Sequence, residues 1–212
     1  MKGIDWLLLT ALPAEAQPLR QALKLTREQR FTPLPLYRNG PLALALTGPG
    51  GDSARAAIEA LLNALPPQPG RRWLNYGIAG HPEQPLGTWL EIDRLTTPTD
   101  DPPLTPAPLL EHLPRAPLIS LLQPDYAYTY PGCCDLEGYP LARSLLEQRP
   151  AEPFHCLKCI SDNRAQGSGQ IRRHQVRTWS YSLLPLLIPL LPPLSPLLPL
   201  SPLLTPLPPL SR

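Results

Sequence analysis

Residues 4–10 form an apolar run of strand length in which Asp5 is the only charged residue. Apolar side chains that follow one another, instead of alternating with polar ones, are typical of a strand buried on both faces. A helix is predicted over residues 14–25, where leucines and alanines recur at helical intervals. Glu15 falls in its first turn, where the helix dipole favours a carboxylate. The order strand, loop, helix predicts an α/β domain built around a central sheet.

Further strands and helices alternate along the chain. Strands are predicted at residues 37–38, 42–47, 73–76, 89–95, 118–122 and 154–160. Helices are predicted from Asp52 or Ser53 to Leu65, at residues 137–146 and at residues 170–184. The first two strands form a hairpin, and the Asn39-Gly40 pair between them favours a type I′ turn. Residues 96–117 contain seven prolines and no periodicity, so an irregular crossing loop is predicted there.

The prolines divide the chain into two regions. Ten of the 33 prolines lie in residues 183–212. Such close spacing breaks helices and removes the backbone donors that a central strand or a membrane span needs. We therefore expect an α/β domain over residues 1–184, large enough to bury a core, and a leucine- and proline-rich tail over residues 185–212. The tail is expected to be extended, to be dispensable for folding and not to be a transmembrane helix.

The composition excludes several classes of protein. Basic and acidic side chains nearly balance, at 19 and 17, which excludes a basic nucleic-acid-binding tail. Two phenylalanines in the whole chain do not favour a protein that stacks on single-stranded bases. The apolar start of the chain resembles a signal peptide in part, but Asp5 and Pro13 interrupt it, so we expect a cytoplasmic protein.

Four cysteines occur as two close pairs, Cys133 with Cys134 and Cys156 with Cys159. Two such pairs have the spacing of a four-thiolate zinc site. Cys156 and Cys159, however, lie in the predicted strand at residues 154–160, and side chains three positions apart on a strand point to opposite faces. Reduced, buried thiols with no metal and no other cofactor are therefore predicted.

Three carboxylates stand at the ends of predicted elements: Glu15 after the first strand, Glu137 at a helix start and Asp162 after the last strand. Open α/β sheets bind ligands at the carboxyl ends of their strands, and converging carboxylates suit acid–base chemistry on a polar ligand. Taken singly, each is typical of a helix cap or a solvated charge. The glycine turn at residues 48–51 is either a cradle for an anion or a sugar or a turn that lets a helix pack.

Five short motifs together resemble the nucleoside phosphorylase/nucleosidase superfamily, and most closely its methylthioadenosine/S-adenosylhomocysteine nucleosidase branch. They are, in order, TALPAE at residues 10–15, LTGPGG at 46–51, NYGIAGH at 75–81, CDLEGY at 134–139 and KCISDN at 158–163. The DLEG and ISDN segments are the specific ones. The resemblance implies a single α/β domain with a central mixed, partly barrel-like sheet flanked by helices.

The resemblance also implies roles for individual residues. Glu137 would hold the ribose 2′- and 3′-hydroxyls, with Leu136 in place of the family's methionine, because a carboxylate accepts two hydroxyl protons at once. Asp162, oriented by Ser161, would donate a proton to purine N7 and make the base a better leaving group. Glu15 would activate the attacking water.

The glycine motifs add substrate-binding positions. These are expected at Gly48, Gly77, Ala79 and Gly80. Phosphorylases of the superfamily hold phosphate with arginines, and only Arg55 follows the first glycine motif here. Hydrolysis is therefore favoured over phosphorolysis. Phosphate stays an alternative ligand, because Arg38 of a neighbouring subunit would be able to bind it.

One region departs from the family. The segment between Leu95 and Cys134 is much shorter than in typical nucleosidases, which keep part of the base-binding wall there. The pocket is expected to be shallow or to be completed by a partner subunit, and a homodimer is predicted. The predicted function is cleavage of the glycosidic bond of a purine nucleoside. The alternative is a catalytically weak or inactive nucleoside-binding protein of the same fold.

Overall fold

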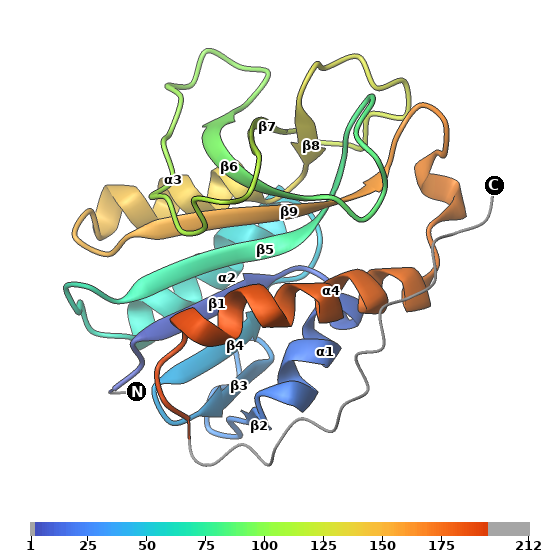
Figure 1. Cartoon of the computed structure of the whole chain (residues 1–212). Helices are drawn as coiled ribbons and strands as arrows, with labels where there is room; N and C mark the ends of the chain where they lie inside the picture. Colours follow the sequence, from blue (N-terminus) through green and yellow to red (C-terminus); the bar gives the residue numbers. More distant parts are fainter. Residues whose placement is uncertain (1–2, 195–212) are drawn as a thin grey trace.

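A mixed sheet of nine strands with four α-helices around it makes up the described part of the chain, residues 3–194 of the computed structural model (Figure 1). The strands are β1 (Trp6–Thr10), β2 (Thr26–Arg27), β3 (Leu36–Asn39), β4 (Leu42–Leu46), β5 (Arg72–Gly80), β6 (Trp89–Thr96), β7 (Arg115–Ser120), β8 (Cys133–Asp135) and β9 (Phe154–Asp162). The helices are α1 (Pro13–Ala22), α2 (Gly51–Ala64), α3 (Gly138–Gln148) and α4 (Arg173–Leu187), with two short 3-10 helices, η1 (Ser168–Gln170) and η2 (Ile188–Leu190).

Strand β1 lies inside the sheet and runs parallel to both of its neighbours, β4 and β5. The hairpin of β3 and β4, with the short β2, extends the sheet on one side. On the other side β5 pairs with both β8 and β9, and the series β5–β8–β7–β6–β9 returns to β5. These five strands form a closed barrel. The expected α/β fold with a mixed, partly barrel-like sheet is confirmed.

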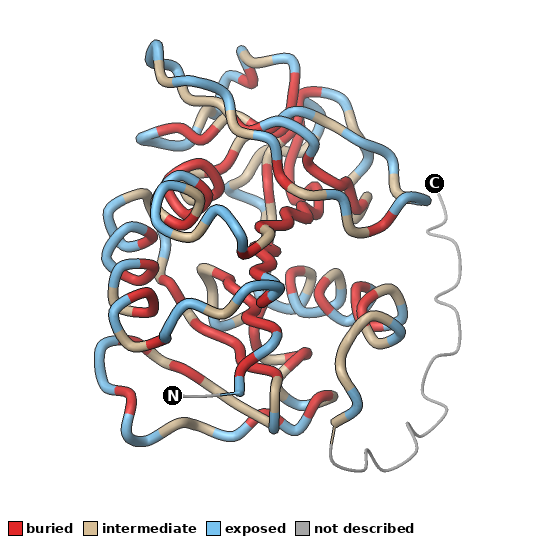
Figure 2. The backbone as a smooth tube through the Cα atoms, turned by 90° about the vertical axis from the view of Figure 1, so that its left-hand side faces the viewer, coloured by how far each residue is buried: buried red, intermediate tan, exposed pale blue. Residues whose placement is uncertain are grey.

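The continuous apolar run at the start of the chain is explained by two separate apolar cores. Leu7 and Leu9 of β1 belong to one core, and Leu8 belongs to the other. All three side chains are fully buried. In Figure 2 the buried residues run through the middle of the molecule, and the exposed residues lie at its rim.

Pairs of helices close the two cores on opposite faces of the sheet. Ile58 of α2 and Leu145 of α3 belong to the first core, while Leu19 of α1 and Leu183 of α4 belong to the second. Helices α1 and α4 lie side by side on the face toward the viewer in Figure 1. This packing fixes both helices relative to the carboxyl ends of β1, β5 and β9.

The hairpin is confirmed, but the predicted type I′ turn is wrong. Asn39 is the last residue of β3 and pairs with Leu42, so the connecting residues are Gly40 and Pro41. Only Gly40 has a positive φ, of 57°. A type I′ turn needs positive φ at both central residues, and the ring of Pro41 excludes it.

The predicted caps of the second helix are also wrong. Helix α2 begins at Gly51, before both Asp52 and Ser53, and its N-cap is Gly50 with a φ of 89°. The glycine turn itself therefore starts the helix, in a conformation that side chains disfavour. Asp52 instead lies in the first turn, where it suits the helix dipole.

Several strand ends differ from their predictions. Strands β5 and β9 both run past the predicted ends, because they pair with each other as far as Gly80 and Asp162. Strand β7 begins and ends earlier than the predicted 118–122 and includes Pro117. This proline lies next to a register shift between β6 and β7, where a missing backbone donor is tolerated.

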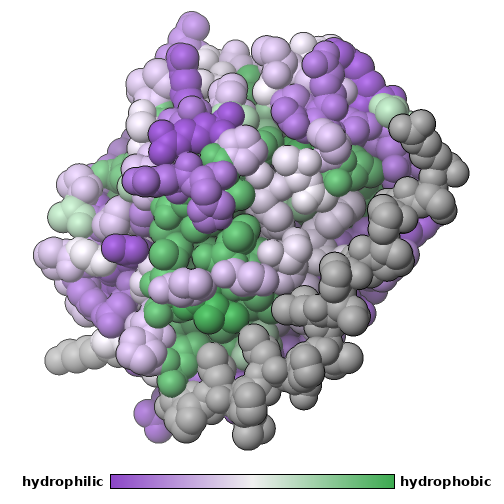
Figure 3. Space-filling view, viewed as in Figure 1, coloured by the Kyte–Doolittle hydropathy of each residue, from purple (hydrophilic) through white to green (hydrophobic). Residues whose placement is uncertain are grey.

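Helix α4 ends at Leu187, beyond the predicted Leu184, although Pro185 lies inside it. Pro185 is exposed, so the hydrogen bond that it cannot make faces solvent, while Leu187 is fully buried. Apolar residues as far as Leu194 pack on the second core, and Figure 3 shows apolar side chains on the surface around this part of α4. Residues 195–212 of the predicted tail lie outside the described residues.

None of the helices within residues 3–194 combines the length and the apolar character that a membrane crossing requires.

Candidate active site

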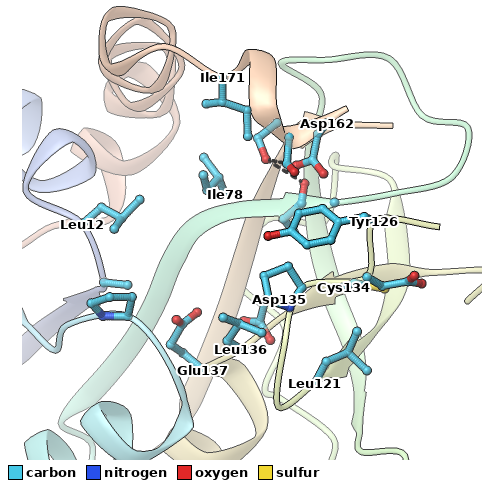
Figure 4. A pocket seen from close by; sticks show the side chains of 18 of the residues that line it. Leu12, Ile78, Leu121, Tyr126, Cys134, Asp135, Leu136, Glu137, Asp162 and Ile171 are labelled. Atoms are coloured by element: carbon cyan, nitrogen blue, oxygen red, sulfur yellow. Dashed lines mark hydrogen bonds between the residues drawn. The ribbon is translucent and has the colours of Figure 1, made fainter. Parts of the chain in front are cut away.

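A cavity of about 230 Å³ opens at the carboxyl ends of β5 and β9, beside the loop that follows β1. Glu15, Glu137 and Asp162 all line it, and Figure 4 labels Glu137 and Asp162 in its wall. They come from three elements that are far apart in the sequence: the first turn of α1, the N-cap of α3 and the last residue of β9. The structure therefore brings the three predicted carboxylates together.

Glu15 is fixed by three hydrogen bonds. The Thr10 hydroxyl and the Leu12 amide donate to Oε2 at 2.6 and 2.8 Å, and the Ile78 amide donates to Oε1 at 2.8 Å. The side chain is buried, and burial raises the pKa of its carboxyl above the usual value, against the opposing effect of these donors and of Lys158. A base whose pKa moves toward neutral pH accepts a proton more readily once it is ionised.

Gly77 lies outside the lining of the cavity but against the Glu15 carboxylate. A Cβ at this position would lie 2.8 Å from Glu15 Oε1, closer than a carbon can approach. Gly48 also lies outside the lining, in the loop before α2, with a φ of 79°. The other predicted positions, which are Leu136, Ser161, Ala79 and Gly80, all line the cavity.

Glu137 meets the glycine turn that precedes α2. The Gly50 amide donates to its Oε1 at 2.6 Å, so the turn positions a carboxylate. Burial raises the pKa of Glu137, and the nearby charge of Asp135 raises it further, while Lys158 lowers it.

A buried ion pair lies beneath these carboxylates. Lys158 Nζ is 2.8 Å from Asp135 Oδ2, and the two side chains are 2% and 1% exposed. The Ser120 hydroxyl and the Gly138 amide also donate to Asp135. Burial acts to lower the pKa of Lys158, but the neighbouring acids, Asp135 first among them, hold it above its ordinary value, so the amine stays charged. Sequence reasoning missed this pair, although a lysine inside an apolar strand was the available signal.

Asp162 accepts a hydrogen bond at each of its carboxylate oxygens. The Ser161 hydroxyl donates to Oδ1 at 2.5 Å, and the Tyr128 hydroxyl donates to Oδ2 at 2.7 Å. Tyr128 is buried, and its backbone has a positive φ of 51°. Burial, followed by the hydrogen bond to Asp162, raises the pKa of the Tyr128 phenol well above its usual value. Tyr128 was not predicted, because an irregular loop carries it and no pattern fixes which residue of such a loop turns inward.

The charge in the cavity has one sign. Five carboxylates occur among its described lining residues, and none of those residues is basic. Arg55 lines a neighbouring cavity instead and pairs with Asp52 at 3.2 Å. The Arg38 guanidinium donates to the carbonyls of Gly40 and Gly3, beyond the opposite end of β1. Neither predicted phosphate ligand reaches this cavity within one chain.

The predicted orientation of Cys156 and Cys159 is confirmed, whereas burial holds for three of the four cysteines, because Cys134 is only partly buried. Cys156 and Cys159 belong to different cores and so lie on opposite faces of β9. All four cysteines are free thiols. Among the described residues no group of three or more His, Cys, Asp or Glu side chains is placed to hold a metal ion.

Known structures of nucleosidases have the same fold. No family model matches the sequence, and a search of curated proteins found no match. A nucleosidase (MTAN) from Chlamydia trachomatis is 23% identical, with a TM-score of 0.70, and the match covers 88% of this chain and 97% of that one. The 5′-methylthioadenosine/S-adenosylhomocysteine nucleosidases of Campylobacter jejuni and Helicobacter pylori are 16% and 14% identical, with TM-scores of 0.70 and 0.71. These matches cover 88% and 90% of this chain, and 98% and 100% of the other two.

The fold similarity extends over nearly the whole length of each of these proteins. It points to the same group of proteins as the motifs at residues 10–15, 134–139 and 158–163, and residues of all three motifs line one cavity. This chain therefore has the fold of the 5′-methylthioadenosine/S-adenosylhomocysteine nucleosidases.

Proposed function

We propose that the protein hydrolyses the N-glycosidic bond of purine nucleosides. The observation that carries the proposal is the meeting of Glu15, Glu137 and Asp162 in one cavity, each held by its own set of donors. Two buried carboxylates and a third that is partly buried are costly near one another, so their convergence is explained best by a ligand that uses all three.

The reaction assigns one step to each of two carboxylates. Asp162 acts as the general acid and delivers a proton to N7 of the base as the bond between N9 and C1′ breaks, so that the base leaves neutral. Positive charge develops on the ribose ring, and water attacks C1′. Glu15 takes a proton from this water and returns it to Asp162 through solvent once the products have left. The products are a free base and ribose.

Glu137 is the proposed ligand of the ribose hydroxyls. Its Oε1 already accepts from the Gly50 amide, which leaves Oε2 free to accept from O2′ and O3′. Leu136 lines the same side of the cavity and offers an apolar surface to the sugar. The hydrogen bonds of Glu137 Oε2 with O2′ and O3′ should favour ribosides over deoxyribosides.

The charge of the cavity favours water over phosphate as the nucleophile. A phosphate dianion beside five carboxylates, of which only Asp135 is paired with a buried lysine, would be strongly disfavoured, whereas water carries no charge. Phosphorolysis is therefore the less favoured reaction at the same site. It requires a cation from another subunit.

The known structures support a purine substrate. A Chlamydia trachomatis variant of this fold was determined with MTA bound, and another structure of that protein holds adenine. The Helicobacter pylori structure holds butyl-thio-DADMe-Immucillin-A. We extend these ligands to the present chain as candidates, with 5′-methylthioadenosine as the first to test.

The experiment is a product assay with purified protein and a panel of nucleosides, with and without phosphate. Release of free base and ribose, unchanged by phosphate, is the expected result. Asp162→Asn should lower kcat by about 10²- to 10⁴-fold, because it removes a general acid, and should leave substrate binding nearly unchanged. The control is Asp93→Asn, which alters an exposed carboxylate on β6. Equal turnover in wild type and Asp162→Asn contradicts the proposal.

A noncatalytic nucleoside-binding protein is the second candidate. The observation that favours it is that the Ser161 and Tyr128 hydroxyls already occupy both oxygens of Asp162. Nucleoside binding with no base release in the product assay would support this candidate and contradict the first.

We further propose a homodimer and a cytoplasmic location. Leu122 and Tyr126 flank the cavity region with 91% and 72% of their surface exposed, as an apolar contact with a second copy would require. Four free thiols favour a reducing compartment. Light scattering on the purified protein tests the dimer, and fractionation of the source cells tests the location.

A further inference from the structure

Tyr128 lies directly against the carboxylate that is proposed above as the general acid. Its hydroxyl donates to Asp162 Oδ2 at 2.7 Å. Asp162 lines the active-site cavity (Figure 4), but Tyr128 does not. The Tyr128 side chain is buried, while that of Tyr126 in the same loop is exposed. A residue in this position acts on a ligand of the cavity only through Asp162.

The loop that carries Tyr128 is fixed by side chains at both of its ends. The Asp125 carboxylate accepts from the amides of Ala127 and Thr129 and from the Thr129 hydroxyl, at 2.6–3.0 Å. Arg164 Nη2 donates to the Tyr128 carbonyl at 2.9 Å. Tyr128 itself has a φ of 51°, which is a strained conformation for a residue with a large side chain. Such strain persists only where the surroundings fix it, and it is concentrated at functional sites.

A glycine of β5 leaves room for the contact between Tyr128 and Asp162. A Cβ at Gly80 would lie 3.1 Å from Asp162 Oδ2 and 3.5 Å from Tyr128 Cε1, so a side chain there would crowd the carboxylate. Strand β5, strand β9 and the loop before β8 are far apart in the sequence. All three are shaped around one pair of groups, the Tyr128 hydroxyl and the Asp162 carboxylate.

The two oxygens of Asp162 differ in how firmly each is held as an acceptor. The Ser161 hydroxyl donates to Oδ1 at 2.5 Å, but the Ala79 carbonyl, at 3.3 Å, is a second acceptor for the same hydroxyl. A hydroxyl has one proton, so Ser161 can turn to Ala79 and release Oδ1. The Tyr128 hydroxyl has one acceptor among the described residues, which is Asp162 Oδ2. Oδ1 is therefore the oxygen that can carry a proton, while Oδ2 remains an acceptor.

We propose that Tyr128 is a positioning residue of the general acid, which holds Oδ2 of Asp162 so that the proton sits on Oδ1 and leaves from there to N7 of the base. The inference rests on the proposed function, which makes Asp162 the acid. As the proton moves, the bond between Oδ1 and hydrogen breaks and a bond between N7 and hydrogen forms. The electron pair of the bond between N9 and C1′ passes to the base.

The role of Tyr128 follows from where the charge goes in this step. The negative charge left on Asp162 is shared by Oδ2, to which the phenol donates. A hydrogen bond to a charged group is stronger than one to a neutral group, so the contact strengthens as the proton leaves. Tyr128 therefore stabilises the state after proton transfer more than the state before it.

The binding test uses two nucleosides that resist cleavage, the 5′-methylthio derivatives of 9-deazaadenosine and 7-deazaadenosine. The first carries a hydrogen on N7 and so matches the state after proton transfer, whereas the second has a carbon at that position. Titration calorimetry should show that Tyr128→Phe binds the 9-deaza compound about tenfold more weakly than wild type, as the loss of a hydrogen bond to a charged group would give. Binding of the 7-deaza compound should be unchanged.

The kinetic test compares 5′-methylthioadenosine with 4-nitrophenyl 5-methylthio-5-deoxyribofuranoside, whose leaving group needs no proton. Tyr128→Phe should lower kcat for 5′-methylthioadenosine about tenfold and leave KM nearly unchanged. Its kcat for the nitrophenyl compound should equal that of wild type. A general defect in folding or in sugar binding would lower both rates, so the comparison isolates the action through Asp162.

The matched control is Tyr130→Phe, which removes a hydroxyl from the same loop at a partly buried residue that does not line the cavity. It should bind and cleave all four compounds as wild type does. Unchanged binding of the 9-deaza compound by Tyr128→Phe overturns the inference. So does an equal loss in Tyr130→Phe, or an equal loss of kcat on both substrates in Tyr128→Phe.

The binding test separates this inference from the proposed function. If wild type releases no base but the 9-deaza compound binds about tenfold more weakly to Tyr128→Phe, the hold of Tyr128 on Asp162 stands and the hydrolase does not. If wild type and Tyr128→Phe cleave 5′-methylthioadenosine equally fast, the hydrolase stands and the positioning role does not.

Discussion

Replacing Lys158 with methionine should destabilise the protein strongly, because it leaves Asp135 as an unpaired charge in the interior. The pair is buried at both ends, with 2% and 1% of the side chains exposed and 2.8 Å between the charged atoms. Removing one partner of such a pair costs about 3–5 kcal/mol. For a chain of 212 residues this loss corresponds to a melting temperature lower by about 6–20 °C.

The same substitution should change the pH dependence of activity. The charge of Lys158 lowers the pKa of Glu15, against the larger effect of burial. Without that charge the pKa of Glu15 rises further. If Glu15 acts as the base, activity requires its ionised form, so the acidic limb of the kcat/KM profile should move to higher pH.

Differential scanning calorimetry and kcat/KM profiles measure the two effects. Arg143→Met is the control, since Arg143 is 44% exposed and pairs with Asp101 and Glu147 at the surface, where ion pairs contribute about 0–1 kcal/mol. Adding Asp135→Asn to Lys158→Met should recover part of the lost stability, because no buried charge then remains unpaired. A Lys158→Met protein that melts as late as the Arg143→Met control would refute the reasoning.

Three further substitutions or truncations test other contacts. Gly77→Ala should lower kcat at least about tenfold, because the added Cβ would lie 2.8 Å from Glu15 Oε1 and would displace the carboxylate. Circular dichroism verifies that the variant is folded, and an unchanged kcat would contradict this role of Gly77. Tyr128→Phe should cost about 1–2 kcal/mol in urea denaturation, because it removes a buried hydroxyl that donates to a carboxylate. A chain that ends at residue 184 loses the buried Leu187 and should melt about 4–10 °C lower, whereas one that keeps all the described residues should match wild type.

The sequence indicates the fold well where burial leaves a clear pattern. The apolar run at residues 4–10 predicted β1 because a strand between two cores has no polar face. The closed barrel, in contrast, depends on pairing between β5, β8 and β9, which are distant in the sequence, and periodicity does not report such pairing. Helix α4 ended later than predicted because the tertiary burial of Leu187 outweighs the cost of a proline in the last turn.

The candidate site was predictable only in part, for a related reason. Glu15, Glu137 and Asp162 stand at element ends, and those ends meet at the carboxyl edge of the sheet. Tyr128 lies in an irregular loop, and Lys158 acts from inside a strand, so their positions follow from tertiary packing. Gly77, expected beside the substrate, instead leaves room for a carboxylate.

The most direct test of the central claim is the origin of the oxygen on the product sugar. Purified protein is incubated with 5′-methylthioadenosine in ¹⁸O-labelled water that contains phosphate, and the products are analysed by mass spectrometry. Hydrolysis predicts free adenine and a 5′-methylthioribose that carries one ¹⁸O at C1. A sugar 1-phosphate without label, or bound nucleoside with no adenine released, would contradict the account.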